Sequence, residues 1–235
     1  MKKTLGVLGG MGPQATIDFQ QKVLDFTSAL KDQEHMRVVI DNHPQIPPRV
    51  AALLGQGESP VEAMQKSLDI LYESGARIIA MPCVTAHYFL PQLKIQKDVE
   101  FLRMPEITSA ACLLLFPGKV AGILSTEVSA KSEVFSSEIE KNGVKYIIPS
   151  SGDFKILDRL ILGVKSKQDR KELVREFIPI IENMRVSGAD YFVLACTEVP
   201  IIVSAYDFPH PFVDATTELA KASIEACGYG LTTAQ

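Results

Sequence analysis

The sequence has few of the residues that build metal sites or disulfide frameworks. It contains four cysteines and four histidines in 235 residues, with no C-x-x-C pair and no H-x-x-x-H pair. So few cysteines in a chain of this length do not form a disulfide framework, and we expect them to be core residues, ligands or nucleophiles. Because no cysteines or histidines stand at ligand spacing, we expect no metal site.

The sequence also lacks an excess of positive charge and a long apolar run. Its formal net charge is −4, so it has no basic field to attract nucleic acid or anionic lipid. No segment approaches the ~20 apolar residues that span a bilayer. The glycines of MKKTLGVLGGMGP interrupt the first apolar run before it resembles a signal sequence. We therefore expect a cytoplasmic protein without nucleic-acid or membrane partners.

Apolar residues make up 46% of the chain, which suits one large or two modest globular domains. Short apolar runs alternate with segments of helical periodicity. Strands are predicted over 4–8, 37–40, 77–81, 119–124, 145–148 and 191–195. Helices are predicted over 14–30, 60–74, 132–141 and 169–187. Because strands that alternate with helices form parallel sheets covered by helices, the predicted fold class is α/β.

Two segments of the chain resemble each other. GARIIAMPCVTA begins at Gly75 and GADYFVLACTEV at Gly188, and each contains a cysteine at the same distance from its glycine. These segments are 113 positions apart, while KTLGVL at Lys3 and KVAGIL at Lys119 are 116 apart. The similar offsets favour a duplicated half. The alternative is chance, because Gly-Ala commonly separates a helix from a buried strand.

Cys83 and Cys196 each follow a predicted strand and precede a predicted helix. Parallel sheets bind ligands beyond the carboxyl ends of their strands, so halves that face each other would place one thiol on each side of a shared pocket. Such a pair suits inversion of a carbon stereocentre, in which a base removes a proton from one face and an acid returns it to the other. A helix N-terminus lowers a thiol pKa toward neutrality, which favours this role. Cys112 and Cys227 lie in apolar stretches and are predicted to be core residues.

Five segments together resemble the aspartate/glutamate racemase superfamily, and within it the cofactor-independent aspartate racemases. They are LGGMGPQAT at 8–16, DQEH at 32–35, NHPQIPPR at 42–49, MPCVTAH at 81–87 and ACTEV at 195–199. The resemblance implies two pseudosymmetric α/β domains, each a small parallel sheet flanked by helices, with the active site in the cleft between them. It also implies domains at 1–105 plus 212–235 and at 106–211, a C-terminal helix over 214–228 that returns to the first domain, and a homodimer.

The activity that this resemblance implies is racemisation of aspartate, with a small dicarboxylic amino acid as partner and no cofactor. Cys83 and Cys196 match the family's two acid/base cysteines. Arg49 matches an arginine that binds a substrate carboxylate, for which a guanidinium fork is suited, and Lys165 matches a carboxylate-binding lysine. The other positions that match substrate-binding segments are Met11, Val84, Thr85, Ala86, Thr126, Thr197 and Glu198.

Each of these positions also has a structural interpretation. The threonines and Glu198 are suited to cap helices, Lys165 to end one, and Arg49 to lie at the surface. The backbone N–H groups of Thr85 and Ala86 are suited to receive a carboxylate. His87 is predicted to lie in the first turn of a helix rather than to act as a base. The loop 9–13 lacks the spacing of both nucleotide-binding glycine motifs.

Three positions depart from the family pattern. Val84 stands where the family has asparagine, Val128 where it has glycine and Ser129 where it has threonine. The loss of an amide contact in a polar site costs about 1–3 kcal/mol. A glutamate or broad-specificity racemase, a decarboxylase or isomerase of the same fold, and a weakly active or non-catalytic dicarboxylate binder therefore stay open. Against the glutamate branch, which has histidine after the second Cys-Thr, this chain has Glu198.

Overall fold

The chain divides into two compact units in the computed structural model, which describes residues 2–232. Unit 1 comprises Met1–Ile107 and Thr216–Gln235, and unit 2 comprises Thr108–Ala215. The domains predicted from the sequence were 1–105 plus 212–235 and 106–211. In both units the boundary falls inside a helix, because α4 and α10 each begin in one unit and continue into the other.

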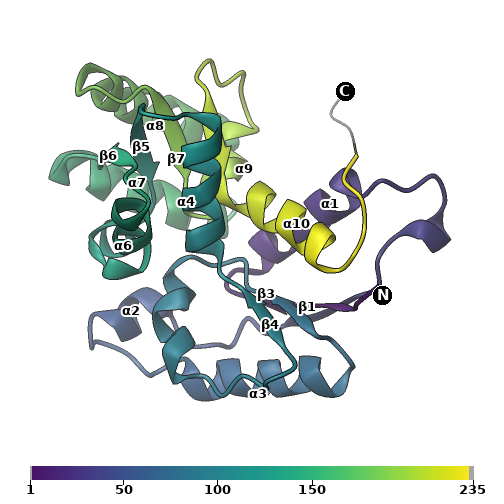
Figure 1. Ribbon diagram of the computed structural model, residues 1–235. Helices are drawn as coiled ribbons and strands as arrows, with labels where there is room; N and C mark the ends of the chain where they lie inside the picture. Colours follow the sequence, from purple (N-terminus) through teal and green to yellow (C-terminus); the bar gives the residue numbers. More distant parts are fainter. Residues whose placement is uncertain (1, 233–235) are drawn as a thin grey trace. The chain divides into compact units, whose positions relative to one another are not determined.

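Unit 1 is built on a parallel four-stranded sheet with the strand order β2-β1-β3-β4. Its strands are β1 (Leu5–Gly9), β2 (Val38–Asn42), β3 (Ile78–Ala80) and β4 (Glu100–Leu102). Its helices are α1 (Pro13–Phe26), α2 (Arg49–Leu53), α3 (Val61–Glu73), α10 (Ala215–Ala226) and the 3₁₀ helices η1 (Asp32–Glu34) and η2 (Thr85–Gln92). Figure 1 shows α3 against one face of this sheet and α1 with α10 against the other.

Unit 2 has a second parallel four-stranded sheet, with the order β6-β5-β7-β8. Its strands are β5 (Val120–Leu124), β6 (Lys145–Ile147), β7 (Tyr191–Leu194) and β8 (Phe212–Asp214). Its helices are α4 (Met104–Leu115), α5 (Glu127–Lys131), α6 (Glu133–Lys141), α7 (Ser151–Lys165), α8 (Arg170–Val186) and α9 (Val199–Val203). The two strand orders are the same once the second is shifted by four strands, so the predicted fold of two parallel sheets flanked by helices is confirmed.

The Gly-Ala repeat has the same structural purpose in both units. Gly75 and Gly188 follow α3 and α8 with left-handed φ values of 88° and 106°, a conformation in which glycine ends helices without strain. The alanine that follows each glycine, Ala76 or Ala189, packs against β1 or β5 respectively. A Cβ on Gly6 would lie 2.8 Å from the Cβ of Ala76. The equivalent atom on Gly122 would lie 3.1 Å from the Cβ of Ala189, so small residues allow each helix end to meet its sheet.

Each sheet has its own apolar core on one face. In unit 1, residues of α3 pack against β1 and β3, and this cluster includes Leu8, Met64, Leu68, Leu71 and Ile79. In unit 2, residues of α7, α8 and α9 pack against β5 and β7, and the cluster includes Leu124, Leu157, Phe177, Phe192 and Ile202. Burial of one such side chain contributes about 1.5–3 kcal/mol. These rigid layers hold the loops at the carboxyl ends of the strands in place.

Among residues 2–232, no helix is long and apolar enough to cross a membrane. The prediction that Cys112 and Cys227 are core residues is confirmed, since both are fully buried. Burial also raises the pKa of the Cys227 thiol to about 12. Cys227 is therefore a thiol at neutral pH, and neither side chain is accessible.

Candidate active site

Cys83 lies beyond the carboxyl end of β3, the central strand that pairs with β1 and β4. Its N–H donates to the carbonyl oxygen of Met81 over 2.8 Å, which turns the chain away from the strand. The residue is 7% exposed. The segment that follows is the 3₁₀ helix η2, with Val84 at its N-cap position, so the predicted helix after Cys83 is present in a tighter form.

His87 fixes the backbone around Cys83. Its Nδ1 lies 2.9 Å from the carbonyl oxygen of Cys83, and its Nε2 accepts a hydrogen bond of 3.1 Å from the N–H of Met104. Because a backbone N–H can only donate, the ring proton is on Nδ1 and is donated to Cys83. His87 lies in η2, as predicted, but in a buried position with both ring nitrogens bonded.

Burial lowers the pKa of His87 from 6.5 to about 4, and the nearby positive charge of Arg103 acts in the same direction. The folded protein therefore binds this proton more weakly than the unfolded chain. The stability that the neutral ring contributes is complete above about pH 6.5 and is lost as the pH falls toward 4.

From these values we expect acidification from pH 7.5 to pH 5 to cost about 2 kcal/mol of stability through His87 alone. The measurement is denaturant unfolding of the wild type and His87→Phe at both pH values, since phenylalanine does not titrate. The wild type should lose more stability on acidification than the variant. Equal losses in the two proteins would contradict the assignment of a depressed pKa to His87.

Cys196 occupies the equivalent place in unit 2, beyond the carboxyl end of β7. Its N–H donates to the carbonyl oxygen of Leu124, at the end of the neighbouring strand β5, over 3.1 Å. The residue is half-buried. The short helix α9 begins at Val199, so Cys196, like Cys83, lies in a strand-to-helix turn at the carboxyl edge of a parallel sheet.

A buried carboxylate lies beside the thiol of Cys196. The Sγ donates to Oε2 of Glu198 over 3.1 Å, and the hydroxyl of Thr197 donates to the same oxygen over 3.3 Å. The other oxygen, Oε1, lies 3.4 Å from the Nζ of Lys165. The Glu198 side chain is only 4% exposed, and these contacts compensate for the burial of its charge.

The pKa of Cys196 was expected to be lowered by the helix that follows it, and this expectation is wrong. Burial raises the pKa of Cys196 well above its ordinary value, the negative charge of Glu198 raises it further, and Lys165 only partly opposes them. A five-residue helix that begins three residues later supplies too weak a field to compete. Cys196 is therefore a thiol at neutral pH, hydrogen-bonded to Glu198.

The other predicted site residues of unit 1 follow β1, β2 and β3. Met11, Val84 and Ala86 are buried, and Thr85 is half-buried at the start of η2. Arg49 is the first residue of α2, and its Nη1 donates to the carbonyl oxygens of Ile46 and Pro47, each over 3.1 Å. Arg49 is thus half-buried rather than a free surface residue, and its buried Nε has no hydrogen-bond partner among residues 2–232.

The predicted residues of unit 2 gather around β5 and β7. Lys165 is the last residue of α7 and meets Glu198, Thr197 and Cys196 in one cluster. Thr126 follows β5 and caps α5 by accepting a hydrogen bond from the N–H of Ser129. The structural interpretation of Thr126 as a helix cap is therefore confirmed, and it is compatible with substrate binding.

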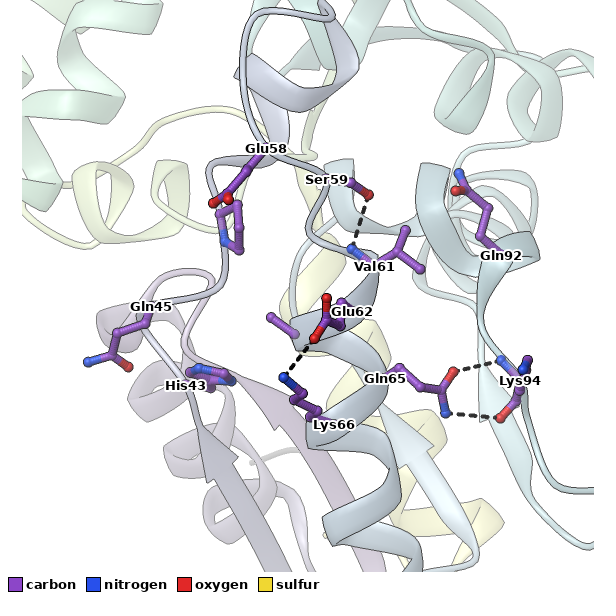
Figure 2. A pocket seen from close by; sticks show the side chains of 12 residues that line it. His43, Gln45, Glu58, Ser59, Val61, Glu62, Gln65, Lys66, Gln92 and Lys94 are labelled. Carbon is purple, nitrogen blue, oxygen red and sulfur yellow. Dashed lines mark hydrogen bonds and ion pairs between the residues drawn. The ribbon is translucent and has the colours of Figure 1, made fainter.

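A pocket of about 910 Å³ lies elsewhere on unit 1, among residues 43–47, 58–66 and 92–94. Figure 2 shows polar and apolar side chains around it, including the Lys66–Glu62 ion pair and Gln65, whose side chain is hydrogen-bonded to the backbone of Lys94. None of the predicted site residues lines it. In residues 2–232, no group of three or more His, Cys, Asp or Glu side chains is arranged to hold a metal ion.

Sequence reasoning did not predict the contact between His87 and Cys83. The available signal was the four-residue spacing of the two residues directly after a buried strand, which places a side chain over the backbone of the preceding turn. Met104, the other partner of His87, stands 17 positions along the chain. No local pattern connects these two residues.

Comparison with known proteins agrees with this architecture. The Asp/Glu/hydantoin racemase family model matches residues 8–223. An aspartate racemase from Picrophilus torridus superposes with a TM-score of 0.89 at 33% identity, covering 98% of this chain and 96% of that one. The broad specificity amino-acid racemase RacX of Bacillus subtilis is 25% identical over 94% of this chain and 96% of its own length.

A more distant likeness shows the fold alone. The glutamate racemase isoform RacE1 of Bacillus anthracis superposes with a TM-score of 0.61 at 11% identity, over 96% of this chain and 82% of that one. The family match runs from the end of β1 through the other seven strands and through the turns that contain Cys83 and Cys196. The chain therefore belongs to the Asp/Glu/hydantoin racemase family.

Proposed function

We propose that this protein is an aspartate racemase that inverts Cα by two-base proton transfer between Cys83 and Cys196. The observation that carries the proposal is the equivalence of the two cysteines. Each follows the third strand of a parallel sheet, and the two sheets have the same strand order. Two like acid/base groups are what a reaction needs when its substrate and product are mirror images. The aspartate racemase similar to this chain at 33% identity supports aspartate as the substrate.

The environments of the thiols define their starting roles. Cys196 donates to the carboxylate of Glu198, so it begins as the acid that delivers a proton to Cα. Cys83 has no comparable carboxylate contact among the described hydrogen bonds, and we assign it the starting role of thiolate base. The Cα proton passes to Cys83 while Cys196 protonates the opposite face, which leaves Cys83 as thiol and Cys196 as thiolate for the reverse reaction.

Positive charge near the substrate lowers the cost of this proton removal. Loss of the α-proton places negative charge on the substrate carboxylate, and cations held beside it stabilise that charge. The Nε of Arg49 has no hydrogen-bond partner within the described part of the chain, which supports the assignment of Arg49 as a carboxylate ligand. Lys165 has a half-exposed side chain, so its ammonium group can serve a substrate carboxylate as well as Glu198.

A broad-specificity amino-acid racemase is the second candidate. It is favoured by Val84, which supplies a buried apolar side chain where the family has an amide, and by the similarity to RacX. An apolar contact discriminates weakly between substrates, whereas a site built to hydrogen-bond a polar group rejects analogues strongly. Val84 would therefore relax the selection of the side-chain carboxylate.

The test is chiral chromatography of purified protein incubated with single enantiomers, without added pyridoxal phosphate. We expect D-aspartate from L-aspartate, and an efficiency for aspartate at least about tenfold above that for glutamate. Similar efficiencies for acidic and neutral amino acids would favour the broad-specificity alternative. Binding of aspartate without turnover would identify a non-catalytic dicarboxylate binder and contradict the proposal.

A further inference from the structure

We propose that His87 is a positioning residue that holds Cys83, and with it the N–H of Val84, in the orientation that proton transfer requires. This inference rests on the proposed role of Cys83 as an acid/base group. The hydrogen bonds described for the His87 ring go to backbone groups and not to the thiol. His87 acts through the backbone carbonyl of Cys83, to which its Nδ1–H donates over 2.9 Å.

Both the backbone N–H and the side chain of His87 are hydrogen-bonded to the segment that contains Cys83 and Val84. The N–H of His87 donates to the carbonyl of Val84 over 3.0 Å, while its side chain reaches back to the carbonyl of Cys83. The far side of the ring accepts the N–H of Met104, the first residue of α4. The ring of Phe101 packs edge-on against the imidazole, with centroids 6.2 Å apart. The Cys83 carbonyl, the Met104 N–H and the Phe101 ring therefore hold the imidazole in one orientation.

The hydrogen bond from His87 to the Cys83 carbonyl also orients the next peptide N–H, that of Val84. The Cys83–Val84 peptide is planar and trans, so its N–H points away from its C=O. When His87 holds the carbonyl on one side, the N–H of Val84 is directed to the opposite side. A donor at the start of η2 is suited to receive a carboxylate. His87 thus links the placement of the thiol to the placement of a backbone donor beside it.

The chemistry of the ring supports a positioning role and excludes proton exchange near neutral pH. Both nitrogens are already bonded, the residue is 6% exposed, and the pKa is lowered to about 4 by burial. An imidazole with a pKa of about 4, whose one ring lone pair already accepts the N–H of Met104, is too weak and too occupied a base to take the Cα proton. It can keep the same hydrogen bonds in every step, which is what a support for a catalytic residue must do.

A matched pair of substitutions tests the inference. Asparagine places an amide donor near the position of Nδ1 and retains only the bond to Cys83, whereas glutamine places an acceptor near Nε2 and retains only the bond to Met104. Each variant loses one hydrogen bond, so a purely structural role predicts similar activities for both. The positioning role predicts that His87→Asn keeps kcat within about threefold of the wild type and that His87→Gln loses at least about tenfold. His87→Phe, which retains neither bond, should resemble His87→Gln.

A second readout does not depend on turnover. Mass spectrometry follows the alkylation of Cys83 and Cys196 by iodoacetamide in the same sample. The alkylation rate of Cys196, which lies in unit 2, serves as the internal reference for the fraction of protein that is unfolded. We expect the ratio of Cys83 to Cys196 alkylation to change in His87→Gln and to stay at the wild-type value in His87→Asn. Equal kcat values and equal ratios in the two variants would overturn the inference. If the wild type does not racemise aspartate, the proposed function fails, while the alkylation ratios still test the positioning of Cys83.

Discussion

Serine at either Cys83 or Cys196 is expected to reduce racemisation at least about 10³-fold in both directions, because each enantiomer needs one of the residues as base and the other as acid. A positioned acid or base contributes about 10²–10⁴-fold to a rate. A serine hydroxyl releases its proton far less readily than a thiol at neutral pH. The measurement is the initial rate of L-to-D and of D-to-L conversion by each single variant.

The control for this experiment is Cys227→Ala, which removes a fully buried thiol of unit 1 that has no role in the proposal. It should retain activity within about threefold of the wild type at temperatures where it stays folded. A Cys83→Ser or Cys196→Ser protein with near wild-type rates would refute the two-base mechanism. Activity that survives in one direction only is also excluded, because the enantiomers have equal free energy and kcat/KM must fall equally for both.

The second large effect is expected from Glu198→Gln. Glutamine retains the shape and a hydrogen-bond acceptor for the thiol, but it removes the negative charge that helps to hold Cys196 protonated. The pKa of Cys196 should fall, and the ion pair between Lys165 and residue 198 should be lost. We expect kcat/KM to decrease about 10–100-fold for both enantiomers, since a displaced thiol pKa reduces the fraction of enzyme in the productive protonation state.

Alkylation of Cys196 as a function of pH measures this change directly. In Glu198→Gln the midpoint should move to lower pH, because the negative charge that helps to raise the pKa of Cys196 is removed. Glu182→Gln is the matched control, because Glu182 lies in the same unit with a 59% exposed side chain and is in contact with His210. An unchanged midpoint in Glu198→Gln would show that Glu198 does not control the protonation of Cys196.

Much of the fold could be predicted because the strongest signals were local. The predicted strand at 145–148 lies within one residue of β6 and the helix at 60–74 within one residue of α3. The helix predicted over 14–30 ends instead at Phe26, and the hydroxyl of Thr27 donates to the carbonyl of Val23 at that end. Leu30, which extended the apolar pattern, is 99% exposed, so the periodicity continued beyond the packed part of the helix.

Elements without a local signal were missed. The strands β4 and β8 have three residues each and lie at sheet edges, where pairing depends on partners distant in the sequence. For α7 the sequence indicated only a helix end at Lys165, which is confirmed, and no range was predicted, although Ser150 and Asp153 form a capping arrangement at its start.

The site shows the same division between local and distant information. The strand-to-turn positions of Cys83 and Cys196 follow from the chain pattern alone. The raised pKa of Cys196 does not, because it depends on how deeply Glu198 and the thiol are buried together. Lys165 joins Glu198 only through folding of α7 against the sheet. The substrate, the individual site roles and the homodimer stay predictions.

The most direct test of the central claim is the isotope content of both enantiomers early in a reaction of L-aspartate in deuterated water. Two separate bases predict that the D-aspartate formed contains deuterium at Cα, while the remaining L-aspartate keeps hydrogen, because the incoming proton derives from a thiol that has exchanged with solvent. Deuterium that enters L-aspartate as fast as D-aspartate appears would indicate a single base acting on one face, and would contradict proton transfer between Cys83 and Cys196.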